Sequence, residues 1–201
     1  MTATFATARS RASYLANGRV RLLPLAELDN RAWRRVAQHF RDPEIAFLNG
    51  TAPNRMPVWL LRRVLKADAR RLDRATYGIL DEQGDYIGTI ELYDIRSDRA
   101  TLGIIIGERS HWSRGYGPEA VDALLTVAFE ERGLQVVQLH TFADNPRART
   151  AFGKVGFREV RRAAVAGGRV DVLMSLSRHV WLERRMARSD PPAAAGSFGA
   201  S

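Results

Sequence analysis

Residues 112–120 constrain the fold most strongly, because a turn with two glycines here joins a buried strand to a helix. They read Trp-Ser-Arg-Gly-Tyr-Gly-Pro-Glu-Ala. Residues 102–107 before them form the apolar run of a buried strand, and residues 120–129 after them show helical apolar spacing. Gly115 and Gly117 let a backbone approach a ligand closely. Because the first helical turn also offers unpaired N–H groups, the segment predicts a phosphate or pyrophosphate site.

Two common phosphate motifs do not fit this segment. A P-loop requires Lys directly after its second glycine, and Gly117 is followed by Pro118. A dinucleotide fingerprint requires a third glycine at a fixed offset, early in the chain. Gly115 and Gly117 have no such partner, and they lie beyond the middle of the 201 residues.

The segment instead resembles the Gln/Arg-x-x-Gly-x-Gly/Ala loop of the GCN5-related N-acetyltransferase (GNAT) superfamily, which holds the pyrophosphate of acetyl-CoA. Residues 144–157 resemble the second signature of that family, an Asn followed by a short helix that ends in Lys-x-Gly-Phe. The resemblance covers residues 18–177. It is nearest to the branch of ribosomal-protein N-terminal and aminoglycoside acetyltransferases, in which a Trp often stands where Trp112 stands.

The element pattern agrees with the α/β (α+β) class that this resemblance implies. The GNAT fold has a central mixed, mostly antiparallel sheet of about seven strands flanked by about four helices. We expect strands at 19–25, 76–80, 86–93, 100–107, 136–142, 157–166 and 170–177, and helices at 27–40, 58–72, 120–129 and after Asn145. In the second helix, Trp59, Leu60, Val64 and Leu65 are predicted to face inward. Residues 42–57 are predicted to be a turn-rich connector.

The ends of the chain differ in composition from its centre. Residues 1–17 are predicted to be a flexible extension, residues 18–183 the acetyltransferase domain, and residues 184–201 a disordered tail. Residues 181–188 are expected to add one or two helical turns.

Composition excludes several classes of function. The chain has no cysteine, which excludes disulfides, thiolate metal sites and a Cys nucleophile. It has no apolar run of transmembrane length, so we expect a cytoplasmic protein without a membrane partner. Its net charge of +9 comes almost entirely from arginine and favours anionic partners. Acetyl-CoA is one such anion, and RNA is the less favoured alternative. The sequence does not encode the oligomeric state, and no metal site is predicted.

The resemblance assigns cofactor contacts to particular residues. It implies that the backbone of Ile105, Ile106 and Gly107 pairs with the pantetheine arm. The pyrophosphate is expected to lie against Ser113, Arg114, Gly115, Tyr116 and Gly117. Asn145 matches the Asn that contacts the pantetheine region. Arg149 is either a second phosphate contact or an exposed helix charge.

Three residues are candidates for the general base. His140 stands on the strand where N-terminal peptide acetyltransferases carry a Glu base, and an imidazole can accept a proton near neutral pH. The alternative role of His140 is a hydrogen-bonded strand histidine. Glu91 is a carboxylate among apolar neighbours or a solvent-facing strand residue, and Glu108 directly follows the cofactor strand.

The helix after Asn145 departs from the family pattern. Phe152 stands where many members carry a Tyr, and phenylalanine cannot protonate a thiolate. Its ring can still pack against the thioester end of the cofactor. Tyr116 lies within the pyrophosphate loop, too far from the sulfur. We therefore predict that no dedicated general acid serves the reaction.

These features predict transfer of an acetyl group from acetyl-CoA to a primary amine by direct attack. The acceptor is a protein N-terminus or a small molecule such as a polyamine or an aminoglycoside. Two alternatives remain: a catalytically inactive acyl-CoA-binding module, and a basic RNA- or ribosome-associated protein.

Overall fold

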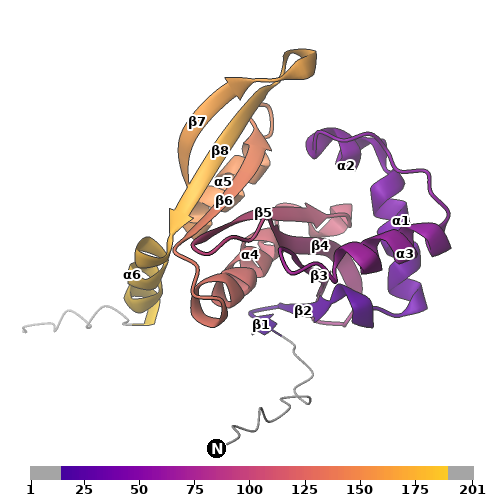
Figure 1. Cartoon of the computed structure of the whole chain (residues 1–201), viewed down its shortest axis with the longest axis horizontal. Helices are drawn as coiled ribbons and strands as arrows, with labels where there is room; N and C mark the ends of the chain where they lie inside the picture. The colour runs from indigo at the N-terminus through magenta and orange to yellow at the C-terminus, as the bar shows by residue number, and fades with distance from the viewer. Residues whose placement is uncertain (1–14, 190–201) are drawn as a thin grey trace, which may run out of the picture.

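The computed structural model describes residues 15–189, which form one mixed sheet with helices on both faces (Figure 1). The strand order is β1-β2-β3-β4-β5-β6-β8-β7. The strands are β1 Leu15–Asn17, β2 Val20–Pro24, β3 Ala75–Leu80, β4 Tyr86–Tyr93, β5 Arg99–Ile106, β6 Val136–Phe142, β7 Arg158–Ala164 and β8 Val170–Ser177. The helices are α1 Asn30–Arg41, α2 Pro43–Leu48, α3 Val58–Asp68, α4 Tyr116–Thr126, α5 Pro146–Val155 and α6 Arg178–Ser189. Neighbouring strands are antiparallel except β5 and β6, so the predicted class and mixed sheet are confirmed.

Two predicted boundaries are wrong at the ends of the described chain. Residues 15–17, predicted to be flexible, form β1, because they pair with β2 in an antiparallel ladder. This strand raises the sheet of residues 15–189 to eight strands. Helix α6 continues to Ser189, so the predicted disordered tail begins too early. The other residues of the predicted extension and tail lie outside the described part of the chain.

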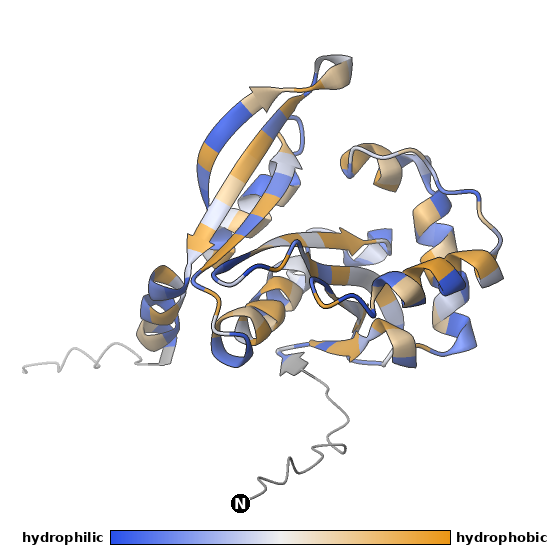
Figure 2. Ribbon diagram, in the orientation of Figure 1, coloured by the Kyte–Doolittle hydropathy of each residue, from blue (hydrophilic) through white to orange (hydrophobic). Residues whose placement is uncertain are grey.

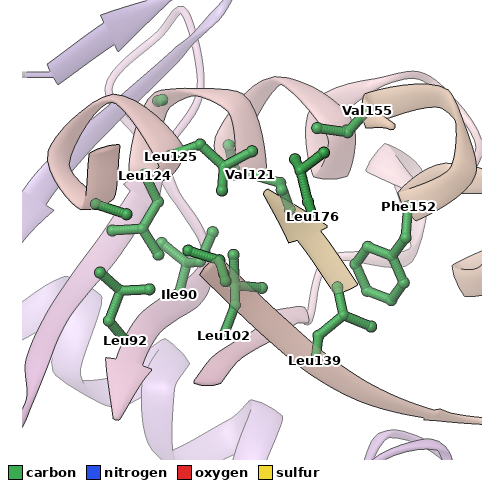
Figure 3. Packing of buried hydrophobic residues seen from close by; sticks show 14 of the residues in the cluster. Ile90, Leu92, Leu102, Val121, Leu124, Leu125, Leu139, Phe152, Val155 and Leu176 are labelled. Atoms are coloured by element: carbon green, nitrogen blue, oxygen red, sulfur yellow. The ribbon is translucent and has the colours of Figure 1, made fainter. Parts of the chain in front are cut away.

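Two hydrophobic clusters lie on opposite faces of the sheet. The larger one joins α4 and α5 to the sheet, and Figure 3 shows Leu124 and Leu125 of α4 above Ile90 and Leu102 of the strands. The smaller one joins α1 and α3 to the other face around Trp33. In Figure 2, the helix α4 that packs in the larger cluster is mostly orange, whereas the edge strand β7 carries blue segments. None of the helices in residues 15–189 combines the length and apolar character needed to cross a bilayer.

The region between α1 and β3 differs from prediction in two respects. The connector contains α2, because the Asp42 carboxylate accepts bonds from two backbone N–H groups and Pro43 fits the first helical turn. In α3, Trp59 is 66% exposed and Val64 is 43% exposed, so their predicted inward orientation is wrong. Leu61 is buried instead, because it lies on the stripe of α3 that packs against α1.

Candidate active site

The candidate site lies where β5 and β6 separate. Their parallel ladder pairs residues 99–102 with residues 136–139 and then stops. On its other side, β5 stays paired with β4 as far as Ile106. The last residues of β5 therefore offer an open strand edge, and a cavity of about 840 Å³ occupies the opening. Unpaired backbone groups along such an edge can bind an extended amide-containing chain.

One end of the cavity meets the glycine-containing turn before α4. Gly115 has a φ of 96°, in the left-handed region, and precedes the first helical turn. No side chain caps this helix N-terminus, so its N–H groups are available to an anion. Lys154 adds a cationic group to the lining at this end, and His111 adds a ring whose Nε2 lies 3.2 Å from Asp81. The turn therefore has the donors and charge that a pyrophosphate requires.

Seven of the residues predicted to contact the cofactor line the cavity: Ile105, Ile106, Ser113, Gly115, Gly117, Asn145 and Phe152. The Asn145 side chain is buried, and its Oδ1 accepts a bond from Ala148 N at 3.1 Å, which caps α5. The Ile106 carbonyl accepts a bond of 2.7 Å from the Trp112 indole. One polar group at the open edge is therefore already partnered by the chain itself.

The other four predicted cofactor residues are not among those that line the cavity. The Gly107 N–H donates to Ile87 O at 2.9 Å, and its Cα packs directly against the His39 ring. Tyr116 is buried, and its hydroxyl donates to Glu82. Arg114 bonds to Ser110 O at 3.4 Å. Arg149 lies 3.4 Å from the Glu159 carboxylate, which agrees with its alternative role as a helix surface charge.

His140 is placed on the opposite wall of the cavity from the end of β5. It alternates with the buried Leu139 and Thr141 along β6, so its ring faces away from α4 and α5. The Nδ1 atom lies 2.9 Å from Oδ2 of Asp171 on the neighbouring strand β8. When Nδ1 carries the proton and donates it to this carboxylate, Nε2 is left as an acceptor. The structure thus brings together an imidazole and an orienting carboxylate.

The two carboxylate candidates have different surroundings. Glu91 accepts bonds from Arg74 at 3.0 Å and from Thr76 at 3.3 Å, and it is not among the residues that line the cavity. Burial raises the pKa of Glu91, while Arg74 acts in the opposite direction. Glu108 contacts the buried His39 at 3.1 Å, also away from the cavity lining.

Several lining residues were not found by sequence reasoning. Asp171 was missed because its approach to His140 depends on pairing between β6 and β8. Arg147 stacks 3.6 Å from the centroid of the Trp112 ring, joining α5 to the turn before α4. Tyr93 forms part of the wall, and burial raises the pKa of its hydroxyl. A basic residue at Lys154 was visible in the Lys-x-Gly-Phe signature, but its position beside the turn was not.

Comparison with known proteins gives consistent results. Residues 19–158 match a protein-family model described as "Acetyltransferase (GNAT) domain". The spermidine N-acetyltransferase from Vibrio cholerae in complex with CoA and spermine is similar, with a TM-score of 0.73 and 20% sequence identity over 83% of this chain and 99% of that one. A GNAT-family acetyltransferase from Bacillus anthracis has a TM-score of 0.70 and 12% identity over 83% and 99%. At these identities the structural likeness concerns the fold.

Proposed function

We propose an acceptor class and a general base for this chain, which belongs to the GNAT acetyltransferase family and is an acetyl-CoA-dependent N-acetyltransferase. The acceptor is a small primary amine, and His140 is the base. The observation that carries this proposal is the His140–Asp171 pair on the wall of the cavity, facing the open edge of β5. An inactive binding module would have no need for an oriented imidazole at this position.

The reaction requires the acceptor nitrogen to lose a proton. The neutral amine attacks the thioester carbonyl carbon, the carbon–nitrogen bond forms, and the carbon–sulfur bond breaks to release the CoA thiolate. His140 Nε2 accepts the amine proton, directly or through a water molecule. Asp171 holds the ring by its bond to Nδ1 and stabilises the imidazolium that forms. With Phe152 at the usual Tyr position, the thiolate takes its proton from water.

A small amine suits the charge and shape of this end of the cavity. Of the lining carboxylates, Glu119 is bound by Arg19 at 2.6 Å, which leaves Asp171 as the carboxylate near His140. A negative charge there attracts an ammonium group before it is deprotonated. Helix α2 and the residue that follows it contribute Ile45, Leu48 and Asn49 to the facing wall. The spermine named in the Vibrio cholerae complex is a slim polyamine of the kind such a space would admit.

An acceptor panel tests the proposal directly. Purified protein and acetyl-CoA are mixed with linear monoamines, di- and polyamines, aminoglycosides or peptides with free N-termini, and thiol release is followed. We expect slim linear primary amines to be acetylated and peptides to be poor acceptors. Exclusive turnover of peptides would instead favour the ribosomal-protein N-terminal branch. Acetyl-CoA binding without turnover of any acceptor would favour an inactive module.

A further inference from the structure

We propose that Arg169 is a positioning residue that sets acceptor specificity by fastening α2 to the β7–β8 hairpin. The inference rests on the proposed function, because it concerns the width of the same acceptor space. Arg169 lies at the turn between β7 and β8, and it is not among the residues that line the cavity. It therefore acts through α2, whose inner side chains do line it.

The Arg169 guanidinium joins three segments that are far apart in the sequence. It forms a bidentate pair with Asp144 at 2.7 and 2.9 Å, just after β6. It also donates to the carbonyl oxygen of Phe47 in α2 at 2.6 Å. The guanidinium carbon lies 3.5 Å from the ring centroid of Phe142 and 4.1 Å from that of Phe47. Planar bidentate and stacked contacts of this kind are specific to arginine.

Helix α2 depends on such contacts for its position. It has only six residues, and a helix of this length is not stable in isolation. Its first turn is held by Arg109, which contacts Asp42 and Glu44 at 2.8 Å each. Its last turn is held by Arg169, which binds a carbonyl where a helix C-terminus favours a cation. Loss of either arginine frees one end of this wall.

Gly50 provides a second contact for the end of α2, in this case with Phe142 at the end of β6. It follows α2 with a φ of 66°, and a Cβ placed there would lie 2.6 Å from Phe142 Cζ. The backbone after α2 thus rests directly on the tip of the Phe142 ring. A methyl group at this position would push the end of α2 away from Phe142 of β6 without altering any charge. Gly50→Ala therefore displaces α2 by a steric clash, whereas removal of Arg169 displaces it by loss of an ion pair and a hydrogen bond.

When Arg169 holds α2 in place, the width of this end of the cavity limits which amines reach His140. Leu48 of α2, the following Asn49 and Phe142 of β6 belong to one cavity lining, so the separation of these elements fixes its width. While α2 is held against the hairpin, a slim unbranched amine fits and a bulky branched or polycyclic amine is excluded. Release of α2 widens this end of the cavity and leaves the cofactor turn unchanged.

The experiment compares Arg169→Ala, Arg169→Lys and Gly50→Ala with the parent on the acceptor panel. We expect the ratio of kcat/KM for a bulky amine to that for a slim amine to rise about tenfold in Arg169→Ala and Gly50→Ala. The KM for the slim amine rises while the KM for acetyl-CoA does not change. Arg169→Lys gives a smaller rise, because lysine keeps the charge but not the bidentate geometry. Arg162→Ala is the matched control, since it removes a guanidinium of the same hairpin that binds Glu159.

Hydrogen exchange supplies a readout that needs no acceptor. Amides of residues 45–50 exchange faster in Arg169→Ala than in the parent and in Arg162→Ala. If the parent acetylates no small amine, the proposed function fails, while the exchange result still tests the fastening of α2. Faster exchange with an unchanged acceptor ratio would overturn the specificity role. Unchanged exchange in both Arg169→Ala and Gly50→Ala would overturn the fastening itself.

Discussion

The cofactor end and the acceptor end of the cavity are built in different ways. The backbone of the proposed cofactor end comes mainly from one continuous segment, residues 103–119, which supplies an open strand edge, a left-handed glycine and a helix N-terminus, and α5 adds side chains such as Phe152 and Lys154. The acceptor end is assembled from side chains of α2, β4, β6 and β8 that meet only in the folded chain. Backbone geometry therefore defines the donor site, and long-range side-chain contacts define the acceptor site.

Gly117 offers the largest expected effect and tests the cofactor end. We expect Gly117→Trp to weaken acetyl-CoA binding by about 100-fold or more, because the indole fills the space in front of the helix N-terminus. A Cβ at this position would lie 4.0 Å from Ile106 Cγ1, an ordinary contact. Gly117→Ala is therefore a matched control that folds normally. Titration calorimetry on both variants measures the affinity, and unchanged binding in Gly117→Trp would place the pyrophosphate elsewhere.

His140 is the corresponding test of the acceptor end. We expect His140→Gln to lower kcat by about 100- to 1000-fold, because the glutamine amide cannot accept the proton of the amine. The KM for acetyl-CoA stays the same. Asp171→Asn gives an intermediate loss, because the ring loses its orienting carboxylate. Steady-state kinetics with saturating acetyl-CoA measures both variants.

Glu91→Gln is the control for the base assignment. Glu91 is held by Arg74 and Thr76 outside the cavity lining, so we expect its kcat to remain within about threefold of the parent. A loss in Glu91→Gln that matches or exceeds the loss in His140→Gln would transfer the role of base to the carboxylate.

The same contrast explains what the sequence could predict. The strand, turn and helix around Gly115 are adjacent in the chain, so their apolar spacing and glycines identified them. The pairing of His140 with Asp171, and of Arg169 with Phe47, spans 31 and 122 residues and leaves no local pattern. Register and side-chain direction across distant strands decide these contacts, and no local spacing encodes them.

Local signals also failed in two helices. In α3, apolar residues on more than one side left the buried face undecided, and packing against α1 covers Leu61 while Trp59 and Val64 stay exposed. Helix α2 was overlooked because it is short, although Asp42 followed by Pro43 is a typical helix start. Gly107 was assigned to the cofactor from its place on the strand, whereas its missing side chain makes room for His39.

Phe152→Tyr tests whether the reaction needs a general acid between the cofactor end and the acceptor end, because Phe152 lines the cavity from α5. We expect kcat to change by less than about threefold, because in the proposed mechanism the leaving thiolate takes its proton from water. The Phe152 ring lies 6.2 Å from that of Phe157, and a hydroxyl added at its far end leaves this packing in place. Pre-steady-state acetyl transfer measures the chemical step. A gain of tenfold or more would show that the parent lacks an acid that the reaction needs.

The smallest expected effect concerns His39, which packs behind the end of the cofactor strand and near the start of α2. Burial lowers the pKa of His39, although Glu108 opposes this shift. The neighbouring groups are Glu108 at 3.1 Å, Arg35, Asp42 and the stacked Tyr86 ring. The unfolded state therefore binds a proton more readily than the folded state. The free energy of unfolding is therefore unaffected by His39 above its ordinary pKa of about 6.5. It decreases as the pH falls from there toward the lower pKa that His39 has in the folded state.

Urea denaturation between about pH 7.5 and 5.5 measures this dependence. We expect the midpoint of the parent to fall on acidification and that of His39→Gln to fall less. His179→Gln is the control, because the His179 side chain is 80% exposed and should retain the parent's slope. Equal slopes in the parent and His39→Gln would assign the acid sensitivity to other titratable groups, such as the His111–Asp81 and His140–Asp171 pairs. A shallower slope in His39→Gln would show that the buried His39 ring, which packs between α1 and Gly107 after β5, contributes to the acid sensitivity of the fold. His39 would then support the structure at both ends of the cavity, while each end keeps its own role in binding.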